Sequence, residues 1–283
     1  MASFTNFATL SYNGGTTNSN IVTGEILEAL TAVKTAVSAN YSAGDRITYA
    51  LSLMNTGTAA ITDYTVTDNL GGYTVGANTV YPLAYNAGTV RYYINGVLQT
   101  APTVTAGPPL TVTGLTVPAG GSAVLIYETT ATPVAPLATG SSITNTATIT
   151  GGGLTNPITA QATVETANSA ELSISKALSP TTVTENGQIT YTFVISNTGN
   201  TEATAADNVV VTDTFAPILR NIAVTYNGTA WTEGTNYTYN AATGVFTTLA
   251  GQITVPAATF TQNTDGTFTV TPGTTTLVIT GTV

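Results

Sequence analysis

Residues 4–10 read Phe-Thr-Asn-Phe-Ala-Thr-Leu, and residues 143–149 read Ile-Thr-Asn-Thr-Ala-Thr-Ile. Both segments run into a glycine-rich turn. In a β-strand, alternate residues share one face. These residues are Phe4, Asn6, Ala8 and Leu10 in the first copy and Ile143, Asn145, Ala147 and Ile149 in the second. Because an asparagine on an apolar face needs a polar partner, we expect each strand to close a sandwich that supplies one.

The composition predicts an all-β protein with two domains. The chain has 283 residues, which is enough for two domains that each bury a core. Only 7% of the residues are charged, and 27 Gly and 12 Pro accompany many Thr, Val and Tyr residues. Strand and turn formers therefore dominate, and no long helical periodicity interrupts them.

The charge and the missing residue types exclude several function classes. The net charge is −9 with five basic residues, so nucleic acid and anionic membranes are poor partners. The absence of Cys and His removes disulfides, thiol chemistry, Ser-His catalysis and the usual zinc sites. No segment is long and apolar enough for a membrane span. We expect no cofactor, no metal site and no substrate-converting enzyme.

Two halves of the chain repeat the same motifs in register. The first half contains Lys34, Gly44–Tyr49, Asn55–Gly57 and Val66–Leu70. Their counterparts in the second half, in the same order, are Lys176, Asn186–Tyr191, Asn197–Gly199 and Val211–Phe215. Each half then carries an Asn-Gly hairpin turn, at Asn95–Gly96 and Asn227–Gly228, which favours positive φ angles. Short strands separated by regular turn signals predict two immunoglobulin-like β-sandwiches in tandem.

The halves differ at their ends. The first half continues into Ile143–Ile149 and a return strand near Ile158–Val164, whereas the second half stops at Val283. The corresponding hairpin lies at the front of the chain, in Phe4–Leu10 and Ile21–Ile26. We therefore predict an N-terminal donor hairpin (1–25), a first sandwich (26–165) and a second sandwich lacking its final strands (166–283).

The second sandwich is expected to present an open edge, which soluble proteins normally avoid. Closure of this edge within the same chain, as in a circular permutant, is one alternative. Donation of the hairpin to the second sandwich of a neighbouring copy is the other. This head-to-tail contact does not close on itself, so it builds a filament. A monomeric cell-surface adhesin or binding module is the alternative function.

The repeated motifs resemble the conserved-repeat domain of unknown function that occurs in tandem in bacterial surface proteins. A chain with two such repeats is also similar to the subunits of clostridial endospore appendages. The resemblance implies an extracellular structural protein on a spore or cell surface, whose partners are copies of itself and other appendage or coat proteins. Because Met1–Phe4 begins no recognisable secretory signal, we expect release by lysis of the mother cell.

Strand alternation places one lysine, one aspartate and one asparagine on inward faces. Each charged residue shares its strand face with apolar residues spaced by two. Lys176 lies on the face of Leu172, Ile174 and Leu178, and Lys34 lies on that of Leu30, Ala32 and Ala36. Asp213 lies on the face of Val209, Val211 and Phe215, and Asp68 lies on that of Tyr64, Val66 and Leu70. Buried charges need partners, and burial favours the neutral forms of both an amine and a carboxyl group. A neutral lysine can then attack an asparagine side chain while the acid polarises its carbonyl group.

This trio is similar to that of the self-crosslinking sandwich domains of Gram-positive pilins and adhesins. The resemblance implies an isopeptide bond between Lys34 and Asn145, assisted by Asp68. It also implies a bond between Lys176 and the Asn6 of the next subunit, assisted by Asp213. A buried triad without a bond, or a β-bulge that turns one residue outward, are the alternatives.

Overall fold

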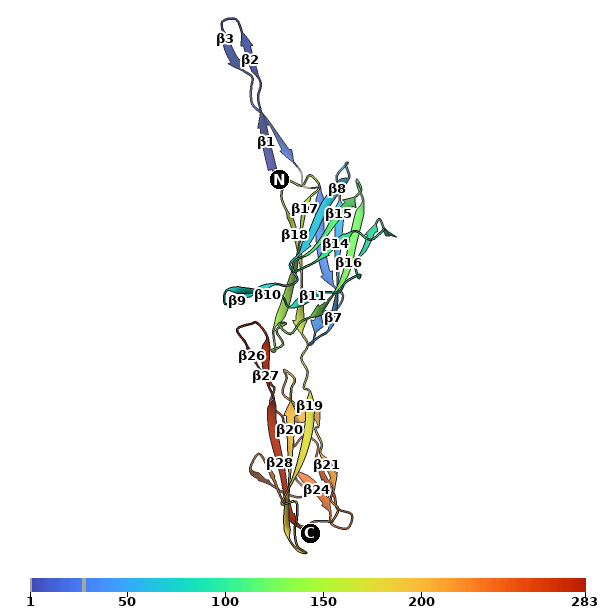
Figure 1. Ribbon diagram of the computed structural model, residues 1–283, viewed down its shortest axis with the longest axis vertical. Helices are drawn as coiled ribbons and strands as arrows, with labels where there is room; N and C mark the ends of the chain where they lie inside the picture. Colours follow the sequence, from blue (N-terminus) through green and yellow to red (C-terminus); the bar gives the residue numbers. More distant parts are fainter. Residues whose placement is uncertain (1, 27–28) are drawn as a thin grey trace. The chain divides into compact units, whose positions relative to one another are not determined.

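The computed structural model describes residues 2–26 and 29–283 (Figure 1). Strands dominate the described residues, and their only helix is a single 3-10 turn, η1 (Ala205–Asp207). The chain divides into unit one, Met1–Ala135 with Ser142–Glu165, and unit two, Pro136–Ser141 with Thr166–Val283. The prediction of an all-β protein with two immunoglobulin-like β-sandwiches in tandem is confirmed. No helix in the described ranges is long and apolar enough to cross a membrane.

The N-terminal hairpin consists of two short ladders. Strand β1 (Ala2–Asn6) pairs with β4 (Val22–Ile26), and β2 (Thr9–Tyr12) pairs with β3 (Gly15–Asn18). The prediction of an unbroken strand over 4–10 is wrong, because the strand is interrupted between Asn6 and Thr9. Three residues of the return strand face two of the first strand there, which shifts the register.

Unit one contains two sheets that share one core. The first sheet runs in the order β13 (Val97–Leu98), β12 (Arg91–Ile94), β16 (Ser122–Ala131), β7 (Arg46–Asn55) and β5 (Leu30–Ala36), and β11 (Leu83–Tyr85) also pairs with β16. The second runs β14 (Thr103–Ala106), β15 (Leu110–Val117), β8 (Ile61–Asp68), β17 (Ser142–Gly151), β18 (Ile158–Thr166) and β6 (Asn40–Tyr41). A separate hairpin joins β9 (Tyr73–Val75) and β10 (Asn78–Val80).

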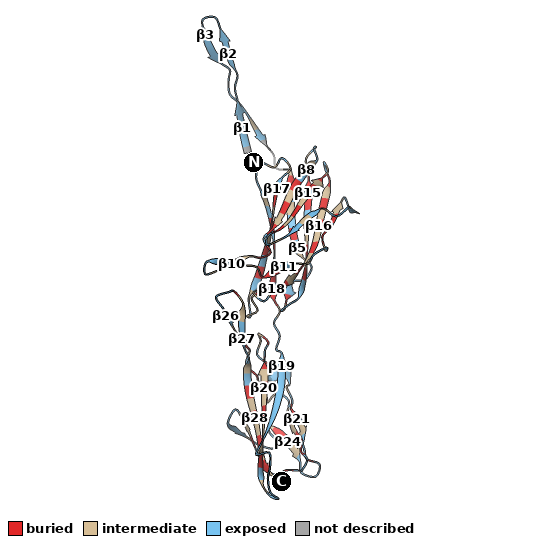
Figure 2. Cartoon of the chain, viewed as in Figure 1, coloured by how far each residue is buried: buried red, intermediate tan, exposed pale blue. Residues whose placement is uncertain are grey.

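In unit one, the residues that alternate as apolar positions in the sequence are also the buried ones. Along β17, the side chains of Ile143, Asn145, Ala147 and Ile149 are buried, and the residues between them are not. Strand β17 lies between β18 and β8, and its Ala147 and Ile149 pair with Asp68 and Val66. Strand β17 therefore closes the second sheet over the core, as Figure 2 shows by its buried residues.

Unit two has the same first sheet but a smaller second one. Its first sheet runs β19 (Leu172–Ser179), β20 (Gln188–Asn197), β28 (Gly273–Thr282), β22 (Arg220–Tyr226) and β23 (Thr229–Trp231). Its second contains β21 (Thr212–Thr214), β25 (Val245–Thr248) and β24 (Tyr237–Asn240), and β26 (Thr259–Gln262) pairs with β27 (Phe268–Thr271). Among the described residues, β21 pairs with β25 alone, whereas its counterpart β8 pairs with strands on both sides.

The Asn-Thr-Gly turns that the two repeats share have a structural role. Asn55 is fully buried, and its Nδ2 donates to the carbonyl groups of Ala59 and Pro118 at 2.8 and 3.0 Å. Asn197 likewise donates to Thr201 and Pro256 at 2.7 and 3.1 Å. Each asparagine therefore links its Asn-Thr-Gly turn to the Val-Pro-Ala segment of the same unit, residues 117–119 in unit one and 255–257 in unit two. The hairpin turns at Asn95 and Asn227 have the predicted positive φ angles.

Candidate functional site: a buried Lys-Asp-Asn cluster and its open counterpart

A buried ion pair crosses the core of unit one. Lys34 lies on β5 of the first sheet, and Asp68 ends β8 of the facing sheet. The Lys34 Nζ and Asp68 Oδ2 atoms are 2.5 Å apart, and the two side chains are 0% and 1% exposed. The inward direction predicted for both residues is confirmed. A pair this deeply buried requires further hydrogen bonds to offset the loss of hydration.

Two donors supply these hydrogen bonds to Asp68. The hydroxyl of Tyr127, which points inward from β16, donates to Oδ2, and the backbone N–H of Leu70 donates to Oδ1 at 3.0 Å. The Lys34 ammonium lies 4.8 Å from the ring centroid of Tyr49, and the rings of Tyr49 and Tyr127 are stacked on each other. The aromatic rings therefore form the walls of the ion-pair site.

Asn145 reaches the same part of the core from β17. It is fully buried, and neither its Oδ1 nor its Nδ2 has a hydrogen-bond partner within the described part of the chain. Because Ala147 pairs with Asp68, Asn145 is the diagonal cross-strand neighbour of that aspartate. An unsatisfied buried amide costs about 1–3 kcal/mol. The structure thus places Asn145 near the ion pair without using its polar atoms.

The pKa values in this cluster reflect burial. Burial lowers the pKa of Lys34 from 10.5 to about 8, and the charge of Asp68 opposes this shift. Burial also raises the pKa of Tyr49 and Tyr127, and the charge of Asp68 adds to the rise. A lysine with a pKa near 8 carries an appreciable neutral fraction at physiological pH, which is the form that acts as a nucleophile.

Unit two contains the same ion pair in an open setting. The Lys176 Nζ lies 2.5 Å from Asp213 Oδ2, but the two side chains are 40% and 18% exposed. The lysine contacts aromatic rings as in unit one, with its Nζ 4.4 Å from the ring centroid of Tyr191. The pair is more exposed because, among the described residues of unit two, no strand takes the place that β17 has in unit one.

The uncovered surface extends along the whole inner face of β19. Leu30 of unit one is 3% exposed, whereas its counterpart Leu172 is 40% exposed, and Ile174 is 55% exposed. Figure 2 shows β19 exposed along its length, as is the N-terminal hairpin. We call this surface, formed by the inner face of β19 and the free edge of β21, the acceptor groove.

The predicted donor residues are also exposed. Phe4 and Leu10 are 54% and 64% exposed, and Asn6 and Ala8 are exposed as well. Their counterparts Ile143 and Ile149 are at most 2% exposed. The structure therefore brings together Lys34, Asp68 and Asn145 in unit one and Lys176 with Asp213 in unit two, whereas Asn6 pairs with Val22 within the hairpin.

Sequence analysis missed Tyr127 as part of the cluster. The alternation of Ala123, Leu125 and Tyr127 along β16 does signal an inward tyrosine, but many inward tyrosines only fill a core. Its counterpart in unit two is Ile279, because Tyr127 pairs with Tyr49 as Ile279 pairs with Tyr191. The carboxylate in unit two therefore lacks this hydroxyl donor.

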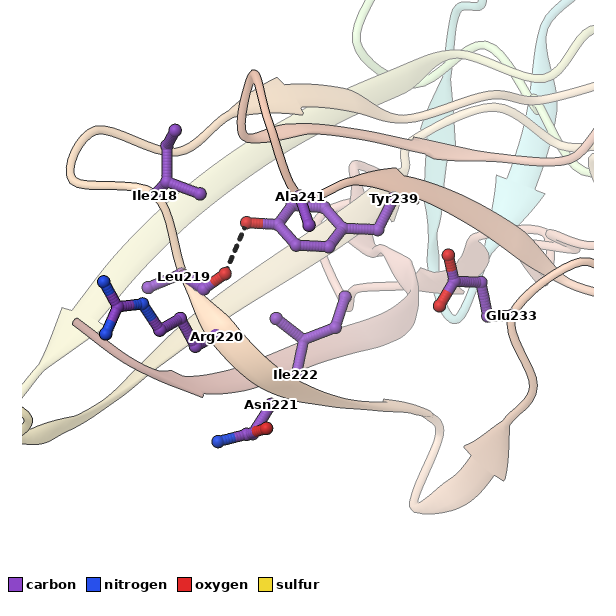
Figure 3. Close-up of a pocket in the computed structure, with 8 residues that line it drawn as sticks. All are labelled: Ile218, Leu219, Arg220, Asn221, Ile222, Glu233, Tyr239 and Ala241. Carbon is purple, nitrogen blue, oxygen red and sulfur yellow. Dashed lines mark hydrogen bonds between the residues drawn. The ribbon is translucent and has the colours of Figure 1, made fainter.

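One further hollow is lined by none of the predicted site residues. A hollow of about 650 Å³ in unit two is lined by residues that include Arg220, Glu233 and Tyr239 (Figure 3). The Tyr239 hydroxyl donates there to the Leu219 carbonyl group at 2.8 Å. Within residues 2–26 and 29–283, no three His, Cys, Asp or Glu side chains are grouped to hold a metal ion.

No family model matches this chain, and no curated protein matches it. Solved structures with a similar arrangement of strands include the major pilin subunit of Bacillus cereus, which is 14% identical. That match covers 96% of this chain and 73% of the pilin, with a TM-score of 0.35. A C-terminal fragment of the major pilin of Streptococcus agalactiae is 14% identical over 87% of each chain, with a TM-score of 0.36.

The collagen-binding subdomain of an Enterococcus faecalis surface protein is 10% identical and covers 49% of this chain and 99% of its own, with a TM-score of 0.31. Similarity at this level does not identify a function. Three features of the structure itself bear on function: a buried Lys-Asp-Asn cluster in unit one, a partly exposed Lys-Asp pair in unit two, and a hairpin whose described strands pair with each other.

Proposed function

We propose that this protein is the structural subunit of an extracellular filament, in which each copy inserts its N-terminal hairpin into the acceptor groove of the next. One observation carries the proposal. Among the described residues, unit two has no strand in the place of β17, which covers the Lys-Asp pair of unit one. The hairpin exposes its apolar side chains and resembles β17 in sequence. Insertion would pair the free edge of β21 and bury both apolar surfaces.

The proposed contact is heterologous, because the hairpin of one copy binds the second unit of another. Such a contact leaves one hairpin and one groove free at the two ends of every assembly, so growth continues into a fibre. On the resemblance of the repeat motifs, we place this fibre on the spore or cell surface, with an endospore appendage as the first candidate. Other appendage or coat proteins are its expected neighbours.

We further propose that the Lys-Asp-Asn clusters form isopeptide bonds. Proton transfer within the Lys34–Asp68 pair gives a neutral amine and a protonated acid. The Lys34 nitrogen then bonds to the side-chain carbonyl carbon of Asn145, the bond to the amide nitrogen breaks, and ammonia leaves with a proton from the amine. Lys176, Asp213 and the incoming Asn6 would repeat this reaction between subunits. The 2.5 Å contacts in both pairs support the assignment.

The filament is tested by moving the hairpin. We expect the full chain to form filaments in negative-stain electron microscopy, and a chain without residues 2–25 to stay monomeric. The matched control carries residues 2–26 after Val283, joined by a flexible Gly-Ser linker, in place of the N-terminal copy. It should close its own groove and remain monomeric. A monomeric full chain would contradict the proposal and favour the adhesin function, and filaments of the chain without residues 2–25 would exclude donation of the hairpin.

A further inference from the structure

The acceptor groove contains a distinct apolar pocket next to the free edge of β21. Its volume is about 210 Å³, and it is lined by Leu172 and Ile174 of β19, Ile195 of β20, and the segment 209–211. The hydroxyl of Ser173 adds little polarity to these walls. An exposed apolar pocket of this kind is stabilised when an apolar side chain fills it.

Unit one shows which side chain fills the equivalent space. Val66 corresponds to Val211 in the repeat, and it pairs across strands with Ile149 of β17. Ile149 is fully buried. The repeat aligns Ile149 with Leu10 of the hairpin, which is 64% exposed in the free chain.

A second pair of positions supports the same alignment independently. In unit one, Gly151 of β17 pairs with the fully buried Tyr64 of β8. In unit two, the counterpart of Tyr64 is Val209, and the hairpin residue that corresponds to Gly151 is Tyr12. The large ring is therefore supplied by the acceptor strand in unit one and by the donor strand here. In both pairs a single large ring occupies the position, so the donor and acceptor strands exchange the source of the ring.

We propose that Leu10 of a second copy is the anchor that fills this pocket and fixes the register of the inserted strand. This inference rests on the proposed function and specifies its interface. Leu10 lies opposite Val211, Tyr12 opposite Val209, and Ala8 opposite Asp213. Asn6 then occupies the position that Asn145 has beside Lys34.

The register has a chemical consequence, because the side chains of a strand alternate between its two faces. A slip of one residue would turn Asn6 away from Lys176, and a slip of two would move it along the groove. Leu10 is therefore a specificity-determining residue for the Lys176–Asn6 pair, although it takes no part in the reaction.

Engineered cysteine pairs test this register, because the natural chain contains no cysteine. The background is Asn6→Ala, which removes the proposed isopeptide link, and all variants are oxidised and compared by non-reducing gel electrophoresis. Leu10→Cys with Val211→Cys should give a disulfide-linked ladder at least about tenfold more abundant than Leu10→Cys with Val209→Cys. In the predicted register, the second pair exceeds the ~7 Å Cα separation that a disulfide bridges.

Two outcomes separate this inference from the proposed function. Filaments in the electron microscope with a ladder only from the 10/209 pair, or from neither pair, would overturn the register but not the filament. The absence of both filaments and ladders would overturn the filament itself.

A volume exchange gives a second test that needs no cysteine in the groove. Val209→Tyr should block filament growth, because two tyrosine rings would then compete for one site, and Val209→Tyr with Tyr12→Gly should restore it. Failure of the double variant to recover growth, while circular dichroism shows a folded chain, would overturn the register.

Discussion

At the scale of single residues, the same ion pair stands in two environments within one chain. Lys34 and Asp68 are buried, whereas the Lys176 side chain is 40% exposed. Removal of one partner from a buried pair leaves an unpaired charge, whereas an exposed pair contributes little. The chain therefore contains its own control for the energetic role of the pair.

We predict that Lys34→Ala lowers the stability of unit one by about 3–5 kcal/mol. The matched variant Lys176→Ala should lower that of unit two by less than about 1 kcal/mol. Both are measured by urea unfolding of a chain without residues 2–25, in a background of Asn145→Ala so that no crosslink contributes. Equal effects of the two substitutions would contradict the assigned burial.

Stability should depend on pH through Lys34 when no bond is formed. Its pKa is about 8 in the folded protein and 10.5 in the unfolded chain, so the unfolded state binds more protons between these values. The contribution of Lys34 to stability is therefore present above pH 10.5 and is lost as the pH falls through 8. In the Asn145→Ala variant the Lys34 amine stays free. We predict that the free energy of unfolding of this variant rises by on the order of 3 kcal/mol as the pH rises through this range.

The crosslinked wild-type protein provides the comparison. Its Lys34 nitrogen is part of an amide and does not titrate. The free energy of unfolding of this protein should therefore not rise over the same pH range. Calorimetric scans of both proteins between pH 7.5 and 9.5 would measure the difference below the range in which exposed tyrosines ionise. The same pH dependence in both proteins would indicate that the wild-type amine is free and that no bond forms.

Alternation in the sequence was sufficient to identify Lys34, Asp68 and Asn145 as inward residues, because burial alternates regularly along β5, β17 and residues 64–68 of β8. It did not reveal the hydrogen bond from Tyr127 to Asp68, which depends on how two sheets face each other. Nor did it reveal the buried role of Asn55 and Asn197, which a turn motif alone does not distinguish from an exposed asparagine.

At the scale of secondary structure, β17 and the N-terminal hairpin are related sequences with different surroundings. Ile149 of β17 is fully buried, whereas Leu10 is 64% exposed. The interruption between Asn6 and Thr9 was not predictable, because residues 4–10 alternate as regularly as residues 143–149. In β17 a neighbouring strand on each side keeps the strand regular, whereas the described strands of the hairpin pair only with each other.

Ile149 and Leu10 occupy equivalent positions of the repeat, but their substitution by alanine should have different effects. Ile149→Ala is expected to destabilise unit one by about 2–5 kcal/mol, because it leaves a cavity in the core. Leu10→Ala should leave the unfolding of the monomer unchanged within about 0.5 kcal/mol and slow filament growth. Thermal unfolding and light scattering measure the two effects. A destabilised monomer in the Leu10→Ala variant would show that the hairpin packs on its own chain.

At the scale of the whole molecule, the division into a donor hairpin and an acceptor groove makes assembly directional. A chain without residues 2–25 keeps its groove but has no hairpin to offer. It should therefore accept one hairpin and stop growth at that end. We predict that filament length falls as the fraction of this deleted chain rises, as measured by electron microscopy.

The control for this effect is the rearranged chain that carries residues 2–26 after Val283. Its groove is filled by its own hairpin, so it should not shorten filaments at any ratio. Equal shortening by both variants would mean that the growing end is capped through another surface.

The most direct test of donation is a titration of the synthetic hairpin, residues 2–26, into the chain that lacks it. We expect one peptide to bind per chain and to raise the melting temperature of unit two while leaving that of unit one unchanged. A peptide with Leu10→Asp should bind far more weakly, because a charge would enter the apolar pocket. The absence of binding to the folded chain, or stabilisation of unit one in place of unit two, would contradict head-to-tail donation.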